Sequence, residues 1–410
     1  MSKYKLSDIA IIKMGQSPPG DTCNVYGEGV ALLNGPAEFT SHYPIPKQYT
    51  TEGKRFCDIG EILFCVRGST TGRMNWADQR YALGRGLASI THKKGIEYNH
   101  FLKFLLQSNL NSILNSANGS TFPNLTTDIL NSIEISIPNE NNQKNISCFL
   151  KNIDLKIELN NRINAELEAM AKTLYDYWFV QFEFPNEQGK PYKSSGGKMV
   201  WNEELKREVP EGWEVKLLRT EIEIQRGISY TSKEINGEGI PMINLNSFNL
   251  NGTYKSEGVK TYSGKFNEKN IVKSGDLLIA ATDVTRNADI IGRAILVPDY
   301  YDEDLVFSMD IAKIISNNIP SSFLMMLFNS NHYHNYIKWY ASGTIVLHLN
   351  LDGINRYNIE LPPTSLLKKF EEFYLPIADR IYMTAKENEK VTKLRDWLLP
   401  MLMNGQVKVE

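Results

Sequence analysis

The sequence has few cysteines, no long hydrophobic run and almost no net charge. Its four cysteines, Cys23, Cys57, Cys65 and Cys148, show no CxxC spacing, which argues against a zinc ribbon or a disulfide framework and favours buried free thiols. The N-terminus MSKYKLSDIA lacks an apolar signal segment, and the longest apolar runs are too short to span a bilayer. We therefore expect a cytoplasmic protein with no membrane contact.

The charge balance excludes some classes of protein but leaves DNA binding open. A formal charge of −2, with 42% hydrophobic residues, excludes a basic-tail protein and a disordered one. A local basic patch remains compatible with this balance. At 410 residues the chain is long enough for two or more domains with cores of their own.

Catalytic motifs are also scarce, and no methyltransferase or nucleotide-hydrolase signature stands out. The stretch RGSTTGR at 67–73 lacks both the spacing and the lysine of a phosphate-binding loop. His332 and His334 are two residues apart on an expected helix, so they point to different faces and form a poor metal pair. Asp299, Asp310 and Lys313 imitate the acidic pair plus lysine of metal-dependent nucleases. That spacing is permissive, so nuclease chemistry is kept only as an alternative.

What the sequence does contain is a long stretch, 142–179, without proline or glycine. It predicts a helix of roughly 55 Å, with Asn139 or Asn141 as its N-cap. Its apolar residues follow a heptad, in which Ile153, Leu167 and Leu174 share one core position with a polar residue, Asn160. Such a stripe needs a second helix to cover it.

Residues 364–404 provide that second helix through an internal repeat. A constant shift of 224 residues carries 153 onto 377, 167 onto 391, and 174 onto 398. The predicted helix-pair core is therefore Ile153, Asn160, Leu167, Leu174, Ile377, Thr384, Val391 and Leu398. The same shift relates Ala117-Asn-Gly-Ser to Ala341-Ser-Gly-Thr, so the chain is a duplicated unit of globule followed by helix.

The repeat also carries polar Asn160 onto Thr384. In an antiparallel pair these two residues would meet near the midpoint and fix the register of the helices at some cost in stability. The alternative is that both side chains are simply exposed to solvent.

These patterns predict an α+β protein with two duplicated α/β globules joined by an antiparallel, pseudo-two-fold pair of long helices. The expected segments are a first globule at 1–140, a helix at 141–180, a linker at 181–212, a second globule at 213–363 and a helix at 364–404. Short apolar runs predict strands, and residues 98–114 and 323–340 have helical spacing. We expect Thr364 to cap the last helix, Pro376 to kink it and Gly405 to end it.

Two globules held by a rigid pair of helices suit a ligand with regularly spaced features, such as duplex DNA. Between Lys47 and Lys94 there are nine Lys or Arg residues against four Asp or Glu. Arginine can contact guanine at two points, and Asn or Gln can do so with adenine. The candidate DNA-binding residues are Arg67, Ser69, Thr70, Arg73, Asn75, Gln79, Arg80, Arg85, Thr282, Thr285, Arg286, Asn287 and Arg293. Solvated surface loops are the alternative interpretation.

Several long strings make the family resemblance specific. They are LYDYWFVQFEFP at 174–185, RGSTTGRMNWADQRYALGRG at 67–86, ATDVTRNADIIGRA at 281–294 and KLRDWLLPMLMNGQV at 393–407. With the repeat and the linker, they make nearly the whole chain resemble the DNA-specificity (S) subunit of type I restriction–modification enzymes.

The resemblance implies that each globule recognises one half of a bipartite, asymmetric site in double-stranded DNA. It also implies that the helices set the spacer and dock two methyltransferase (M) subunits for adenine-N6 methylation. Restriction (R) subunits would join through the M–S complex. S-adenosylmethionine would bind the M subunits, and ATP and Mg²⁺ the R subunits, so this chain would hold no cofactor and perform no catalysis. A coiled-coil adaptor that binds only proteins is a further alternative.

Overall fold

The structure is a computed structural model that describes residues 2–40, 42–117, 123–299, 301 and 303–409. The chain divides into two compact units, one formed by two separate stretches of sequence and the other by one continuous stretch. Unit 1 contains residues 1–161 and 387–410, and unit 2 contains residues 162–386. Each long helix is therefore shared between the units, whereas the sequence had suggested helices separate from the globules.

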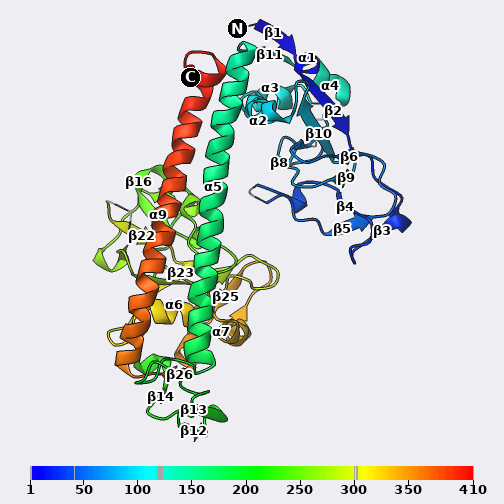
Figure 1. The fold of residues 1–410 in the computed structure, drawn as a ribbon. Coiled ribbons are helices and arrows are strands. Elements are labelled where there is room, and N and C mark those ends of the chain that lie inside the picture. Colours follow the sequence, from blue (N-terminus) through cyan, green and yellow to red (C-terminus); the bar gives the residue numbers. More distant parts are fainter. Residues whose placement is uncertain (1, 41, 118–122, 300, 302, 410) are drawn as a thin grey trace. The chain divides into compact units, whose positions relative to one another are not determined.

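Unit 1 contains three antiparallel or mixed sheets (Figure 1). A two-stranded sheet pairs β1 (Ser2–Lys5) with β11 (Glu134–Ile137). The second sheet has the order β2 (Ala10–Met14), β10 (Leu87–His92), β7 (Ile62–Cys65) and β8 (Met74–Trp76). The third has the order β3 (Cys23–Asn24), β5 (Gln48–Thr50), β4 (Val30–Leu33), β9 (Tyr81–Leu83) and β6 (Phe56–Cys57), with β4 and β9 parallel.

Four short helices accompany these sheets. They are α1 (Leu6–Ile9), α2 (Asn99–Ser108), α3 (Leu110–Asn115) and α4 (Thr127–Ser132). The expected single helix over 98–114 is thus two helices that meet at Asn109, whose side chain donates to the carbonyl of Leu105. A local bond of this kind competes with the helical backbone pattern, which explains the break.

Unit 2 repeats the three sheets of unit 1. The pair β14 (Glu214–Leu217) with β26 (Asn358–Leu361) corresponds to β1 with β11. The order β15 (Glu223–Arg226), β23 (Ile311–Ile315), β19 (Leu277–Ala280), β21 (Ala294–Leu296) corresponds to the second sheet. The order β17 (Lys260–Tyr262), β16 (Ile235–Ile243), β22 (Leu305–Phe307), β18 (Ile271–Val272) corresponds to the third, again with one parallel pair, β16 with β22.

A further small sheet and short helices complete the described part of unit 2. A small sheet joins β20 (Thr282–Asp283), β25 (Leu347–Leu349) and β24 (Ala341–Ser342). The helices of the globule are α6 (Ser321–Asn329), α7 (Asn331–Ile337) and α8 (Asp352–Asn355), so the expected helix over 323–340 is interrupted at Ser330, which caps α7. Among the described residues, no helix combines the length and apolar character that a membrane span requires.

The predicted linker at 181–212 is folded rather than extended. It contains the hairpin of β12 (Met199–Asn202) and β13 (Arg207–Pro210). Phe182 and Phe184 are buried in the core of unit 2, where both rings pack on Trp213. The polar, glycine-rich composition predicted a linker or an extended arm, whereas these aromatic side chains anchor the segment to unit 2.

The two long helices are α5 (Glu140–Tyr175) and α9 (Thr364–Met403). Asn139 caps α5 as expected, since its Oδ1 accepts from the amide of Asn142 at 3.0 Å. Thr364 is the first residue of α9 rather than its cap, and Pro363 accepts the first helical bonds instead. The helix is assigned without a break through Pro376, and Gly405 ends it with φ 68°.

The residues predicted as the core of the helix pair are buried or half-buried. Ile153, Asn160 and Thr384 are buried. The half-buried members are Leu167, Leu174, Ile377, Val391 and Leu398. Leu174 and Ile377 pack on the core of unit 2, and Leu398 packs on that of unit 1.

The polar residues of the stripe are paired one helical turn away from the prediction. In unit 1, Asn160 donates to Asn388 at 2.7 Å and to Glu387 at 2.9 Å. In unit 2, Thr384 donates to Asn164. The predicted Asn160–Thr384 pair is therefore wrong. In antiparallel helices, the 224-residue shift relates one contacting pair, Asn160 with Asn388, to the other, Asn164 with Thr384. It carries Asn160 onto Thr384 and Asn164 onto Asn388.

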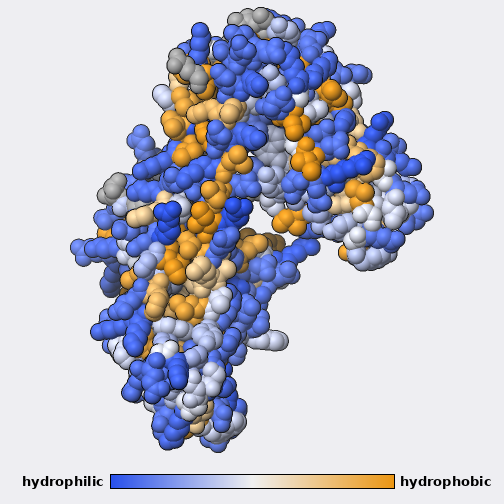
Figure 2. All heavy atoms as spheres, viewed as in Figure 1, coloured by the Kyte–Doolittle hydropathy of each residue, from blue (hydrophilic) through white to orange (hydrophobic). Residues whose placement is uncertain are grey.

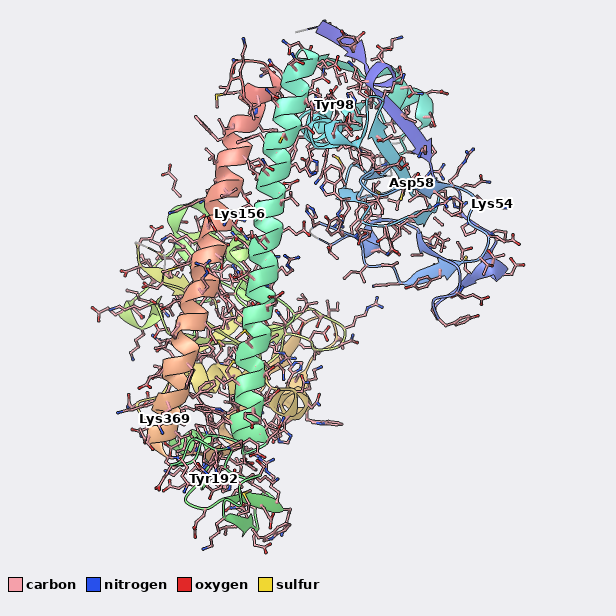
Figure 3. The ribbon with its side chains drawn as sticks, viewed as in Figure 1. Lys54, Asp58, Tyr98, Lys156, Tyr192 and Lys369 are labelled. Atoms are coloured by element: carbon pink, nitrogen blue, oxygen red, sulfur yellow. The ribbon has the colours of Figure 1, made fainter. Side chains whose placement is uncertain are left out.

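Polar contacts accompany apolar ones where the globule of unit 1 meets the helix pair. Ile146 and Leu150 of α5 and Leu402 and Met403 of α9 belong to the core of unit 1. His42 of the globule is 3.6 Å from Glu158 of α5, and Arg395 of α9 is 3.6 Å from Asp154 of α5. Lys103 lies over the ring of Trp76, and its burial lowers the pKa of the ammonium. Figure 3 labels Lys156 on α5, whose ammonium is 3.0 Å from Glu387 on α9.

In unit 2 the helix positions related to Asp154 and Glu158 carry no carboxylate. The repeat carries Asp154 onto Ala378 and Glu158 onto Tyr382. Ala378 belongs to the buried core and Tyr382 packs against it. Around them, Tyr175 and Phe179 of the first long helix and Phe370 of the second form an aromatic cluster with ring centroids 5.1–6.1 Å apart.

Candidate DNA interface

The candidate interface of unit 1 is a group of loops at one end of its sheets. Backbone hydrogen bonds join the loop after β2 to the loop after β9, from Gln16 to Leu83 at 2.8 Å. They also join the loop after β7 to the loop after β9, since the amide of Val66 donates to the carbonyl of Gly86 at 2.9 Å. Leu125 completes the group by donating to Val66. A side chain at Gly86 would lie 2.5 Å from the carbonyl of Asn34, so only glycine fits between these loops.

Several predicted DNA-binding residues meet at this end of the sheets. Arg67 is exposed, and its Nε donates to the side chain of Asn124 at 3.0 Å. Arg85 is exposed on the neighbouring loop, between Gly84 and Gly86. Ser69, Thr70 and Arg73 belong to the loop that follows β7, with Ser69 and Arg73 exposed. Exposed guanidinium and hydroxyl groups on a shared rigid framework can contact phosphates and base edges.

The remaining predicted residues of unit 1 lie elsewhere. Arg80 stacks on Phe56, 4.4 Å from its centroid, and faces Asp58 at the start of β7, the opposite end from Arg67. Gln79 lies beside it and donates to the hydroxyl of Tyr81. Asn75 is 2% exposed and donates to the carbonyl of Thr40. The expectation that Asn75 contacts a base is therefore wrong, because this amide is used inside the globule.

Unit 2 has the same framework with different side chains. Ile228 donates to Phe307 as Gln16 does to Leu83, and Ala281 donates to Asp310 as Val66 does to Gly86. These bonds place Met309 where unit 1 has Arg85. Thr282 pairs with His348 as Arg67 pairs with Asn124.

A buried carboxylate shapes the longest loop of this end of unit 2. Asp283 is 0% exposed and accepts from the amides of Thr285, Ile290 and Ile291 at 2.6–2.9 Å. The loop so held presents Arg286 and Asn287 to solvent. Charge-assisted bonds to three amides make this a rigid platform, because each is stronger than a bond between neutral groups.

Three predicted residues of unit 2 act within this framework. Thr282 is buried and lies 3.4 Å from the carboxylate of Asp310. The hydroxyl of Thr285 accepts from the amide of Asp289. Arg293 is half-buried and donates to the carbonyl of Asn329, and burial lowers the pKa of its guanidinium. The expectation that Thr282 and Arg293 contact DNA directly is wrong for these conformations, since their polar groups face the protein.

The nuclease alternative finds no support in the geometry. Lys313 is 2.6 Å from Asp276, while Asp310 is held by Tyr230 and Thr282, and Asp299 is joined to neither. Over the ranges that the structure describes, no three His, Cys, Asp or Glu side chains come together as metal ligands would. His332 and His334 are likewise separated, since His334 is buried and His332 is exposed.

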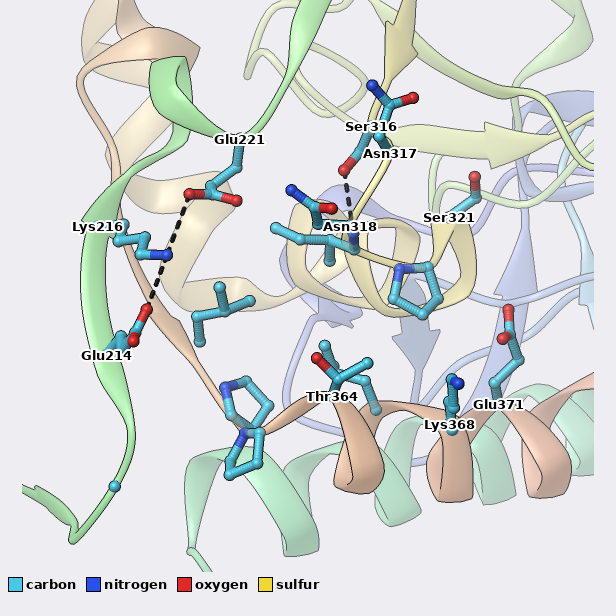
Figure 4. Close-up of a pocket in the computed structure, with 17 residues that line it drawn as sticks. Glu214, Lys216, Glu221, Ser316, Asn317, Asn318, Ser321, Thr364, Lys368 and Glu371 are labelled. Atoms are coloured by element: carbon cyan, nitrogen blue, oxygen red, sulfur yellow. Dashed lines mark hydrogen bonds and ion pairs between the residues drawn. The ribbon is translucent and has the colours of Figure 1, made fainter.

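A cleft of 690 Å³ lies in unit 2, away from these loops (Figure 4). Lys216 on its wall is bound between Glu214 at 2.7 Å and Glu221 at 3.4 Å. Ser316 accepts from the amide of Ile319. Two of its polar lining groups, Lys216 and Ser316, are thus already engaged by the protein itself.

Sequence reasoning missed three residues of the interface, Asn124, Asp283 and Met309. The first was open to discovery, because the 224-residue shift carries Asn124 onto His348 next to the Thr282 loop. Asp283 looked like an ordinary loop carboxylate until its three amide donors were placed. Met309 carried no signal, since an apolar residue in sequence is normally assigned to a core.

Comparisons with known proteins agree with this architecture. The sequence profile described as type I restriction modification DNA specificity domain matches residues 1–169 and 210–391. A specificity subunit of the type I restriction enzyme MjaIX from Methanocaldococcus jannaschii is 26% identical, covering 99% of this chain and 93% of that protein. The HindI specificity subunit from Haemophilus influenzae is 23% identical over 88% and 89%.

A solved structure shares the fold. The type I restriction-modification S subunit from M. genitalium superposes with a TM-score of 0.59 at 15% identity, over 98% of this chain and 96% of that one. The profile spans both repeats of this chain, globules and most of both long helices alike. The chain therefore belongs to the type I restriction–modification DNA-specificity family, as a specificity subunit and not a catalytic one.

Proposed function

We propose that each unit reads one half of a bipartite, asymmetric site in duplex DNA and that α5 and α9 set the spacer between the halves. The observation that carries this proposal is the repeated framework: equivalent loops in both units end on different side chains. A repeated framework fits the DNA backbone, which is the same in both half-sites, and different side chains on it can contact different bases. The helix α5 spans 36 residues and α9 spans 40, and each contributes residues to both units.

Methyltransferase subunits would dock on exposed apolar positions of the helices. Leu159 and Met383 are exposed and 224 residues apart, and so are Met170 and Leu394. Unit 1 thus carries Leu159 and Leu394, and unit 2 carries Met383 and Met170. Figure 2 shows apolar surface gathered over the helices. Repeat-related apolar positions, one set in each unit, suit two copies of the same partner.

The chemistry would belong to the partners. In this proposal the methyltransferase subunits bind S-adenosylmethionine and methylate adenine at N6, while restriction subunits join through the M–S complex and use ATP and Mg²⁺. The residues of this chain recognise DNA and hold the assembly together. An adaptor that binds only proteins would provide no DNA for the exposed Arg67, Arg73 and Arg85 to contact.

The complex of this chain with a methyltransferase subunit tests the proposal. Methylation of a genomic DNA library, followed by detection of N6-methyladenine along single molecules, should yield one asymmetric motif with an unread gap. Active methyltransferase without any motif would overturn the reading of DNA by this chain. Mg²⁺-dependent cleavage by the chain alone, abolished by Asp310→Ala, would favour the nuclease instead.

A separate experiment tests docking. The double variant Leu159→Glu, Leu394→Glu should leave one methyltransferase subunit bound where the unaltered chain binds two, as counted by native mass spectrometry. Lys390→Ala, an exposed change on the same stretch of α9, is the matched control. Retention of two subunits by the double variant would refute this docking surface.

A further inference from the structure

The loop end of unit 2 differs from that of unit 1 at the position of one exposed arginine. Met309 occupies the place of Arg85 and is 45% exposed. Exposed methionine at the centre of an otherwise polar loop group costs solvation free energy unless a ligand covers it.

The small sheet of unit 2 adds to this apolar surface. Asp283 lies opposite Leu347 in the β20–β25 pair, and the residues next to them, Val284 and Val346, are both exposed. Ile345, in the turn between β24 and β25, is 86% exposed. Hydrogen bonds connect this sheet to the Met309 loop, since Ala281 and Thr282 both donate to the carbonyl of Asp310. We call Val284, Met309 and Ile345 the aliphatic cluster.

A carboxylate sits beside the aliphatic cluster. Asp310 is half-buried and is held by Tyr230 at 3.3 Å, Thr282 at 3.4 Å and Ser308 at 3.4 Å. A fixed negative charge repels phosphates, so a duplex bound at these loops would turn base edges towards this patch. The exposed Arg286, on the same loop as Val284, is placed to meet the phosphates at its margin.

We infer that the aliphatic cluster contacts the C5-methyl groups of thymines in the major groove of the half-site read by unit 2. Thymine methyls are the apolar groups that the edges of base pairs present in that groove, and aliphatic side chains are their usual contacts. The three side chains come from three separate loops, which suits a row of methyl groups better than insertion into a single base step. The inference rests on the proposed function and assigns the kind of base that unit 2 reads.

Deoxyuridine, which differs from thymidine only by this methyl group, supplies the test. The methyltransferase complex is assayed on duplexes of its own motif in which each thymidine of the unit 2 half-site is replaced in turn by deoxyuridine. Loss of a buried methyl should weaken binding by about fourfold at one or more positions. In complexes of Ile345→Ala or Met309→Ala, deoxyuridine should no longer weaken binding at the position that the removed side chain contacts.

The control is Ile59→Ala, which removes an equally aliphatic and exposed side chain at the far end of β7 in unit 1. It should leave every deoxyuridine effect intact. A unit 2 half-site insensitive to deoxyuridine, or one equally sensitive in the Ile345→Ala and Met309→Ala complexes, overturns the inference. Increased fluorescence of 2-aminopurine in that half-site, lost in Ile345→Ala, would overturn it in favour of insertion between bases. Absence of any motif would instead be a failure of the proposed function.

Discussion

Unit 1 and unit 2 share a fold but carry different side chains in two places. On the long helices, unit 1 has Asp154 and Glu158, and unit 2 has Ala378 and Tyr382 at the repeat-related positions. At the loops, unit 1 has Arg85 and unit 2 has Met309. The comparison teaches that backbone hydrogen bonds and buried apolar positions define the duplicated framework. The contacts made on it are free to diverge.

The aromatic attachment of unit 2 should be the most sensitive place in the molecule. Phe370→Ala removes a fully buried ring that packs on Tyr175, Trp178 and Phe179. We expect a loss of about 3–5 kcal/mol in the free energy of unfolding of unit 2. Hydrogen exchange followed by mass spectrometry resolves the two units, and faster exchange confined to unit 2 is the expected result. Unchanged protection of unit 2 would contradict the assignment of this cluster as its core.

The loop platform of unit 2 depends on a single carboxylate. Asp283→Ala leaves three amides without their acceptor, and we expect a local loss of about 3 kcal/mol. Residues 284–291 should then exchange rapidly, and DNA binding should weaken while unit 1 is unaffected. Asp283→Asn, which keeps the shape of the side chain but not its charge, should fall between this variant and the natural sequence. Equal exchange in all three proteins would show that the carboxylate is dispensable.

The histidines allow the units to be compared by pH. Burial lowers the pKa of His100 in unit 1 from 6.5 to about 3, and that of His334 in unit 2 to about 4. Below pH 6.5 the unfolded chain takes up a proton that the folded chain refuses, so stability present above pH 6.5 is lost as the pH falls. Each histidine should account for about 2 kcal/mol between neutral pH and pH 5.

His100→Phe separates the two contributions. Phenylalanine keeps a ring against Trp76, 4.4 Å away in the natural protein, but has no proton to gain. Urea unfolding followed by hydrogen exchange at pH 7 and pH 5 should show reduced acid sensitivity in unit 1 and the original sensitivity in unit 2. A variant whose unit 1 remained as acid-sensitive as before would contradict the assignment to His100.

The polar pairs of the helices should have the smallest effect on stability. Replacing both partners of one pair, Asn160→Leu with Asn388→Leu, should change the free energy of unfolding by only about 1 kcal/mol, whereas Asn160→Leu alone should cost more by leaving the Oδ1 of Asn388 without its donor. Urea midpoints of the single and double variants measure the difference. A double variant less stable than the single one would contradict the pairing.

Much of this structure is predictable because the sequence contains the same pattern twice. The absence of proline and glycine predicted the first long helix, the 224-residue shift predicted its partner, and short apolar runs predicted strands. The shift did not predict which residues face each other, because Asn160 meets Asn388 only once the helices are set antiparallel. Asn139 as the cap of α5 was predictable from local chemistry alone.

Burial decided the predictions that failed. Asn75 and Arg293 have the side chains that recognise bases, yet one amide is used by Thr40 and one guanidinium by Asn329. Met309 and Ile345 have the side chains of a core, yet they are exposed. The residue type shows what a side chain is able to bind. The fold decides whether that side chain is used within the protein or is exposed to solvent.

The central claim is that each unit reads its own half-site on a shared framework. It is tested most directly by replacing residues 1–140 with the corresponding globule of another specificity subunit and mapping N6-methyladenine made by the methyltransferase complex. We predict that one half of the motif changes, while the other half and the gap between them stay the same. Changes in both halves, or an unchanged motif, would contradict the account.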